Sequence, residues 1–253
     1  MSEVDIKKLF EAGAHFGHKT SRWNPKMAPF IHSRRGDIHI IDLEKTVEYL
    51  DAALAFLTET VKSGKQVLFV GTKKQARDIV RTAAESVGQP FVTERWLGGM
   101  LTNSATIQSQ IKKLKLFEKR MASGELANRY SKLEVQRFQE EIDLLNIKYG
   151  GIKDMRGRPG AVFVISATED KGAVNEARKS GISVVAICDT NANPTGIEYV
   201  IPANDDAIAS IELITSYAIA AVRDGLAAAP KREEKPLAKP TAMAAKTDKK
   251  EEK

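Results

Sequence analysis

The chain has 253 residues, 42% of them hydrophobic and 28% charged, with a net charge of +6 and a sequence pI near 9.2. This apolar content is enough for a buried core and excludes wholesale disorder, while the basic balance favours a polyanionic partner, either nucleic acid or an anionic membrane surface. With Cys188 as the only cysteine, a charged N-terminus and no apolar run near the ~20 residues that span a bilayer, we expect no disulfide, signal peptide or membrane span, and a soluble cytoplasmic protein.

The first regular pattern is a short apolar run at 38–41, which we interpret as a strand. Asp42 follows as a plausible N-cap, because its carboxylate can accept hydrogen bonds from the first free N–H groups of a helix. Spacings of three and four then predict one apolar helix face, and Ser63 and Gly64 end the helix. That face consists of Val47, Leu50, Leu54, Leu57 and Val61.

A second strand is predicted at 66–71, the stretch QVLFVG, and a helix follows it. Thr72 and Gln75 have the spacing of a capping box, in which two side chains satisfy N–H groups at a helix start, so we place the start of the helix there. Gly88 and Pro90 end it. Its inner face is predicted to hold Ala76, Ile79, Val80, Ala83 and Val87.

Further strands are predicted at 161–166, 183–188 and 199–202, with a helix that ends at Gly181 between the first two. Uniformly apolar strands separated by helices indicate a parallel sheet that is covered on both faces. With right-handed crossovers, this pattern predicts a doubly wound α/β fold. The inward residues of the last helix are Ile211, Ile214, Ala218 and Ala221.

No strand is predicted between 105 and 149, where two long helical patterns follow each other. The stretch ASGELANRYS interrupts them, and Ser131 with Glu134 restarts the helix as a capping box. Two such helices joined by a short loop predict an antiparallel helical hairpin, although two further helices covering the sheet are the alternative. The narrow apolar stripes are Ile107, Ile111, Leu114, Phe117 and Met121, and then Val135, Phe138, Ile142, Leu145 and Tyr149.

These patterns divide the chain into three parts. The α/β domain is discontinuous, comprising 1–104 and 150–226, and the hairpin of 105–149 is inserted into it. The remaining residues, 227–253, are rich in Ala, Pro, Lys and Glu and have no apolar face. We expect this tail to be disordered.

The stretch GTKK at 71–74 joins a predicted strand to a helix, a place where many proteins bind phosphate. A Walker A loop or a dinucleotide fingerprint would need more glycines than the single one present, so neither is predicted. Downstream, Lys74, Arg77 and Arg81 recur at helical spacing and form a basic stripe suited to a phosphodiester backbone. An ordinary solvated helix face is the alternative for each of these charges.

Metal and catalytic sites have little support in the sequence. His15 and His18 are three residues apart, but no obvious fourth ligand accompanies them, and zinc sites usually need four. Cys188 ends a predicted buried strand, which favours a core residue over a nucleophile. The loop 188–196, CDTNANPTG, lies where this fold places active sites, yet turn chemistry explains its composition equally well. We therefore predict no metal, no cofactor and no catalytic residue.

Basic stretches that contain aromatic residues give a clearer indication. The stretch 18–39 has little regular pattern, and we interpret it as an RNA-contact surface on which rings stack against bases while cations meet phosphates. Trp96, within 94–103, can serve the same purpose or anchor the base of the hairpin, and a third basic stretch occupies 153–160. The candidate RNA-binding residues are Lys19, Arg22, Trp23, Lys26, Arg34, Arg35, Lys73, Lys74, Arg77, Arg81, Arg95, Lys153, Arg156 and Arg158.

Several stretches of the chain occur in the same order as in one known family. They are LFEAGAHFGHKTSRWNPKMAPFI, HIIDLEKT, VLFVGTKKQA, RWLGGMLTN, GGIKDM and ICDTNANPTGIEYVIPANDDA, within about residues 5 to 226. Through them the chain closely resembles the second ribosomal protein family of the bacterial small subunit. The resemblance implies a flavodoxin-like α/β domain with a coiled-coil hairpin, bound to small-subunit ribosomal RNA on the solvent side between head and body. It also implies a role in docking the large first protein of that subunit, which captures messenger RNA.

We therefore expect a non-catalytic structural component of the small ribosomal subunit that supports translation by neutralising and fitting the RNA backbone. The hairpin is expected to extend this contact to RNA or to a neighbouring ribosomal protein. Neither a membrane nor a small-molecule substrate is expected as a partner. The alternative is a flavodoxin-like enzyme that binds a nucleotide or sugar phosphate at 71–75 and 189–196, and the missing glycine fingerprint argues against it.

Overall fold

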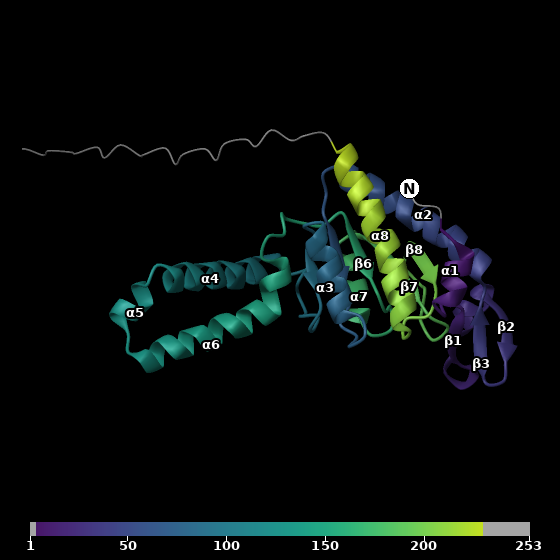
Figure 1. Ribbon diagram of the computed structural model, residues 1–253, viewed down its shortest axis with the longest axis horizontal. Helices are drawn as coiled ribbons and strands as arrows, with labels where there is room; N and C mark the ends of the chain where they lie inside the picture. The colour runs from purple at the N-terminus through teal and green to yellow at the C-terminus, as the bar shows by residue number, and fades with distance from the viewer. Residues whose placement is uncertain (1–3, 230–253) are drawn as a thin grey trace, which may run out of the picture.

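The computed structural model describes residues 4–229 of the chain. At its centre is a five-stranded sheet in the order β5-β4-β6-β7-β8, in which each neighbouring pair of strands is parallel. Figure 1 labels β6, β7 and β8 of this sheet. The predicted parallel sheet is confirmed, but β5 is only two residues long and the sequence pattern missed it. The strands are β4 (Val67–Val70), β5 (Phe91–Val92), β6 (Ala161–Val164), β7 (Ser183–Cys188) and β8 (Tyr199–Pro202).

Both faces of this sheet are buried, because side chains alternate along each strand and both sets are apolar. Val67 and Phe69 of β4 belong to one core, which α2, α3 and α8 close; Leu68 and Val70 belong to the other, which includes α7. The helices are α2 (Leu43–Lys62), α3 (Arg77–Ser86), α7 (Lys171–Lys179) and α8 (Ile208–Ala228).

The start of α2 is where the sequence analysis predicted it, whereas the start of α3 is not. Asp42 caps α2 by accepting hydrogen bonds from the N–H groups of Glu44 (3.1 Å) and Lys45 (3.5 Å). The helix α3 begins at Arg77 without a side-chain cap, so the capping box predicted at Thr72 is wrong. The hydroxyl of Thr72 instead donates to Asp170 (2.8 Å), a partner that is remote in sequence.

A second, antiparallel sheet of three strands, in the order β1-β3-β2, is built from the N-terminal segment. The sequence predicts the strand at 38–41 as part of the parallel sheet and little regular structure in 18–39, and both expectations are wrong. Ile31 is the only apolar residue of β2, and a tight turn at Gly36 (φ 62°) pairs this strand with β3, so tertiary pairing rather than pattern determines it. The segment contains α1 (Ile6–Glu11), β1 (Phe16–Lys19), two 3₁₀ helices (Thr20–Arg22 and Pro25–Phe30), β2 (Ile31–Arg35) and β3 (Ile38–Ile41).

The expected helical pair projects from the sheet on the side away from the small antiparallel sheet (Figure 1). Ser131 and Glu134 form the predicted capping box, and Leu114 packs against Ile142 and Leu145 between the two long helices. Ile107 and Ile111 instead belong to the apolar core of the α/β body that includes Leu68 and Val70 of β4. The elements are α4 (Ser104–Ala122), α5 (Glu125–Arg129), α6 (Lys132–Tyr149) and the 3₁₀ helix η3 (Gly150–Ile152).

The end of α8 extends slightly into the segment that the sequence predicts as a disordered tail. The helix continues to Ala228, so residues 227 and 228 are helical. The rest of the predicted tail, 230–253, lies outside the described residues. Within residues 4–229, no helix has both the length and the apolarity that a membrane span requires.

Candidate functional site

The carboxyl ends of the parallel strands, where doubly wound folds usually bind ligands, are occupied here by an internal ion pair. Lys73 follows β4, and its ammonium lies 2.6 Å from Asp205 and 2.7 Å from Asp206, which follow β8. Ser166, which follows β6, donates a hydrogen bond of 2.6 Å to the second oxygen of Asp205. Lys73, which the sequence analysis predicted to contact phosphate, is therefore paired with carboxylates of its own chain.

Burial and pairing oppose each other at this ion pair. Burial alone would lower the pKa of Lys73, but its hydrogen bonds to Asp205 and Asp206 outweigh burial and raise it. Burial is also the main influence on Asp205, and it raises the pKa of that carboxyl despite the opposing effect of Lys73 and Ser166. Lys73 thus stays positively charged, and its charge compensates the buried carboxylate of Asp205.

His18 extends this cluster toward the small sheet. Its Nδ1 lies 2.9 Å from Asp189 and its Nε2 lies 3.3 Å from Asp206, and the hydrogen bond to Asp189 is the main reason that the pKa of His18 is raised. Together with Asp205, these residues place one ligand atom each within 4.8 Å of one another, a donor set of imidazole and carboxylate that can hold a divalent cation.

His15 and His18 were weighed together as possible metal ligands on their spacing in sequence, but in the structure they have different surroundings. His15 stacks on Phe10 (ring centroids 4.4 Å apart) and contacts the tilted ring of Phe16 (4.0 Å), and burial lowers its pKa. The partners of His18 come from strand ends far along the chain. The sequence signal that could have found Asp205 is the run NDD, one residue after a predicted strand, since carboxyl ends of parallel strands meet at one edge.

Glu176 of α7 fixes the loop that leads from the sheet to the hairpin. It accepts hydrogen bonds from Trp96 Nε1 (3.1 Å) and from the N–H groups of Gly99 (2.7 Å), Leu101 (3.1 Å) and Thr102 (3.4 Å). Partial burial would raise the pKa of Glu176, but these hydrogen bonds outweigh it and lower the pKa from its ordinary value of 4.5. Of the two roles considered for Trp96, the structure supports the anchor at the base of the hairpin.

We expect replacement of Glu176 by Gln to lower the melting temperature at pH 7 and to have little effect in strong acid. The folded pKa lies below the unfolded value, so the stabilisation is complete above pH ~4.5 and is lost as the pH falls through the folded pKa. Thermal unfolding of both proteins from pH 7 to pH 3 measures this difference. Glu198→Gln, at an exposed position, is the control; a difference that persists unchanged at pH 3 would contradict the explanation.

The first group of predicted RNA-binding residues lies on and beside the small sheet. Lys19, Arg22, Trp23 and Arg35 are exposed and form no ion pair within residues 4–229. Arg34 is also exposed, and its Nε donates to the carbonyl of Gly36 (2.8 Å). The sixth residue of this group, Lys26, donates to the hydroxyl of Thr195 (2.7 Å). This sheet therefore presents several free cations and one exposed tryptophan ring.

The second group, along α3, is largely neutralised. Arg77 and Arg81 share the carboxylate of Glu94, at 2.9 Å and 3.3 Å. Lys73 is paired internally, as described above, which leaves Lys74 as the exposed cation of this group without an ion pair in the described part of the chain. The basic stripe that the spacing indicates is present, but two of its three members already have a counter-charge.

The third group lies at the base of the hairpin and is larger than the sequence indicated. A groove of about 470 Å³ between α4 and the loop after η3 is lined by Lys153 and Arg156, and also by Lys112 and Lys115 of α4. Asp154, the single acidic residue of this lining, pairs with Lys115 (3.0 Å), and Lys153 lies 3.4 Å from Glu118. We call this the hairpin-base groove.

Sequence reasoning missed the two lysines of α4. They follow each other at a spacing of three, on the side of the helix away from its apolar stripe, which is also the signal that could have found them. Arg158 is exposed nearby and lines a neighbouring pocket with Met100 and Met155. Arg95 is exposed in the loop between β5 and α4.

Comparison with known proteins identifies the family. The profile of the family described as "Ribosomal protein S2" matches residues 9–225. A protein of Coprothermobacter proteolyticus named "Small ribosomal subunit protein uS2" is 48% identical over 225 residues, which cover 89% of this chain and 84% of that one. Proteins of the same name from Roseiflexus sp. (50% over 213 residues, 84% and 81%) and Chloroflexus aggregans (48% over 223 residues, 88% and 93%) are similar to it as well.

The family match covers both parts of the α/β body and the helical pair. The chain therefore belongs to the ribosomal protein S2 family, whose members are non-enzymatic structural proteins of the small ribosomal subunit.

Proposed function

We propose that this small-subunit protein binds ribosomal RNA through the hairpin-base groove and, as a second contact, through the free cations of the small sheet. It works at the ribosome in the cytoplasm and supports translation. In finer detail, we propose a flavodoxin-like body with a coiled-coil hairpin; support comes from the order of the parallel strands, which is 2-1-3-4-5 when they are counted along the chain, and from the heptad spacing in α6.

The observation that carries the RNA proposal is the charge of the hairpin-base groove. Lys112, Lys115, Lys153 and Arg156 line it; Asp154 pairs with Lys115, and Glu118, just outside the lining, pairs with Lys153, so an excess of two positive charges remains. Phosphodiester oxygens would neutralise this excess, and double-stranded RNA is recognised mainly by its shape and backbone. Arg77 and Arg81 can join such a contact only by giving up Glu94, so we assign them a smaller share.

Neutralising the four cations of the hairpin-base groove to Gln is expected to reduce the salt dependence of binding to small-subunit RNA. Each lost phosphate contact lowers the slope of log K against log salt by about one. The expected change is therefore roughly two from the unpaired Lys112 and Arg156, and it rises toward about four where Lys115 and Lys153 exchange their carboxylates for phosphates. Filter binding of the purified chain between low and moderate salt measures the slope.

Matched neutralisation of Lys7, Lys8, Lys171 and Lys179, four exposed cations elsewhere, is the control and should leave the slope near that of the wild type. If the parent chain binds the RNA without salt dependence, or if both variants lose the same slope, the groove is not the contact.

We further propose that the chain helps to dock the large mRNA-capturing first protein of the small subunit, as its family resemblance implies. Support comes from two exposed apolar side chains, Phe10 of α1 and Phe16 of β1, because exposed apolar surface of this kind commonly contacts protein. Small subunits isolated from cells depleted of this chain should also lack that protein; if they retain it in full, docking depends on other components.

A further inference from the structure

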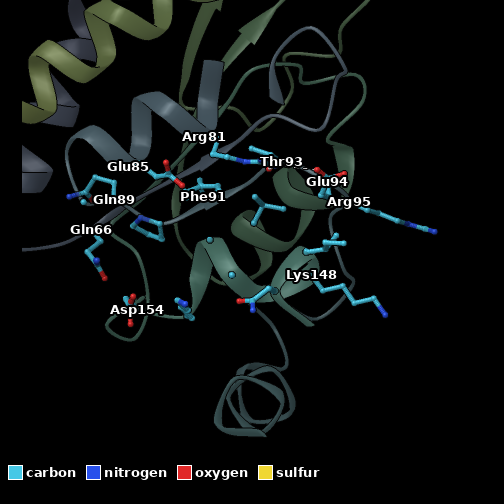
Figure 2. A pocket seen from close by; sticks show the side chains of 18 residues that line it. Gln66, Arg81, Glu85, Gln89, Phe91, Thr93, Glu94, Arg95, Lys148 and Asp154 are labelled. Atoms are coloured by element: carbon cyan, nitrogen blue, oxygen red, sulfur yellow. Dashed lines mark hydrogen bonds and ion pairs between the residues drawn. The ribbon is translucent and has the colours of Figure 1, made fainter. Parts of the chain in front are cut away.

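A second groove lies at the edge of the parallel sheet and shares Lys153 and Asp154 with the hairpin-base groove. It has a volume of about 680 Å³ and is bounded by the end of α3, by β5 and by the last turn of α6 (Figure 2). Pro90, Phe91 and Ile147 supply apolar surface to its lining. We call it the edge groove, and a volume of this size suits a few side chains of one segment rather than a whole domain.

Exposed apolar surface continues from the edge groove for one further turn of α6. Ile147, which lines the groove, and Leu144 lie on the face of this helix opposite the stripe that packs against α4. Leu133 lies on the same face, but Arg137 and Glu140 separate it from Leu144. Leu144 is 57% exposed and Ile147 is 59% exposed, although exposing an aliphatic side chain to water is unfavourable in free energy. The hairpin therefore has an exposed apolar pair, Leu144 and Ile147, that its own chain does not cover within the described residues.

Most charges around the edge groove are already paired, and the exceptions are separated in space. Arg81 pairs with Glu94, and Lys153 and Asp154 pair with α4. Arg95 and Lys148 form no ion pair within residues 4–229, and Figure 2 shows both extending outward on the same side of the groove. Glu85, which is also without an ion pair in that part of the chain, lies at the other end (Figure 2).

We propose that the edge groove is a docking site for a segment of a neighbouring protein that carries apolar anchors next to acidic residues. The anchors would cover Ile147 and Leu144, and the carboxylates would meet Arg95 and Lys148. An RNA strand fits less well, because its phosphates cannot cover aliphatic side chains and because only two cations are free here. The inference rests on the proposed place of the chain in the small subunit.

Site-specific photocross-linking in intact small subunits tests this assignment. With p-benzoylphenylalanine in place of Ile147, we expect a cross-link to one ribosomal protein, within a peptide that contains acidic residues. Reversing both charges with Arg95→Glu and Lys148→Glu should reduce the cross-linking yield by on the order of tenfold, because two attractive contacts become repulsive. Reversing Lys132→Glu and Arg137→Glu, exposed at the far end of the same helix, is the matched control and should leave the yield unchanged.

The possible outcomes separate this inference from the proposed function. A cross-link to RNA, the absence of any cross-link in subunits that contain the chain, or a yield insensitive to the Arg95 and Lys148 reversals overturns the docking site alone. A probe at Leu144 repeats the measurement with a different substitution, and a probe at exposed Gln139 gives the background. If the parent chain itself does not enter small subunits, the proposed function fails, and the docking site fails with it.

Discussion

Replacing Lys73 with Met is expected to lower the free energy of unfolding by about 3–5 kcal/mol, because the change leaves a buried carboxylate without its counter-charge. Asp205 is 1% exposed, and Lys73, which is 15% exposed, lies 2.6 Å from it. Met fills a similar volume but cannot compensate the charge, so Asp205 must take up a proton or admit water. The strand-end loops after β4 and β8 would lose their link.

Urea denaturation at pH 7 measures the loss, with Lys74→Met as the matched control. Lys74 is the next residue and is exposed, so its replacement should change the free energy of unfolding by no more than about 0.5 kcal/mol. The double variant Lys73→Met with Asp205→Asn should recover much of the stability, since it removes both charges. A Lys73→Met protein of normal stability that no longer binds RNA would instead support the phosphate contact that the sequence indicated.

The parts of the fold that the sequence predicted are those with strong local patterns. The strands β4, β6, β7 and β8 are uniformly apolar, and α2 and α6 have both regular stripes and capping residues. The small sheet was missed because β2, with the sequence IHSRR, has no apolar alternation and depends on pairing with β3. The two-residue β5 is too short for any period to appear.

The candidate site was harder to predict, because the sequence shows which side chains are charged but not which of them form ion pairs in the fold. Lys73 and Arg77 looked equivalent as basic residues near a helix start, but their partners, Asp205 and Glu94, are brought to them only by the fold. At the hairpin base, by contrast, the fold adds a cation that was not predicted: Lys112 of α4 lines the same groove as Arg156, although the two are far apart in sequence. Spacing along one helix can be read from the sequence, whereas convergence of loops cannot.

The base of the hairpin depends on a glycine, and we expect Gly151→Ala to lower the free energy of unfolding by about 1–3 kcal/mol through overpacking. A β-carbon at Gly151 would overlap the carbonyl oxygen of Phe91 and would lie 2.7 Å from Cδ2 of that ring. The obstacle is the backbone of β5, which cannot rotate away as a side chain can. The end of the hairpin must therefore move off the edge of the sheet.

Such a movement would affect binding as well as stability. Lys153 and Arg156 come two and five residues after Gly151, so displacing this turn changes their position relative to Lys112 and Lys115 on α4. We expect faster amide hydrogen exchange in β5 and in the last turn of α6, together with weaker binding to small-subunit RNA at low salt.

Gly150→Ala is the matched control, because a β-carbon at this neighbouring glycine would have its nearest contact at 3.6 Å, and the residue has a helical φ of −53°. The control should stay within about 1 kcal/mol of the wild type, since alanine accepts this conformation without strain. Equal behaviour of the two variants would mean that the contact between η3 and β5 does not hold the hairpin in place. A destabilised Gly151→Ala protein that binds RNA with unchanged affinity would separate the hairpin's orientation from RNA recognition, and the hairpin-base groove would then lose its claim as the main contact.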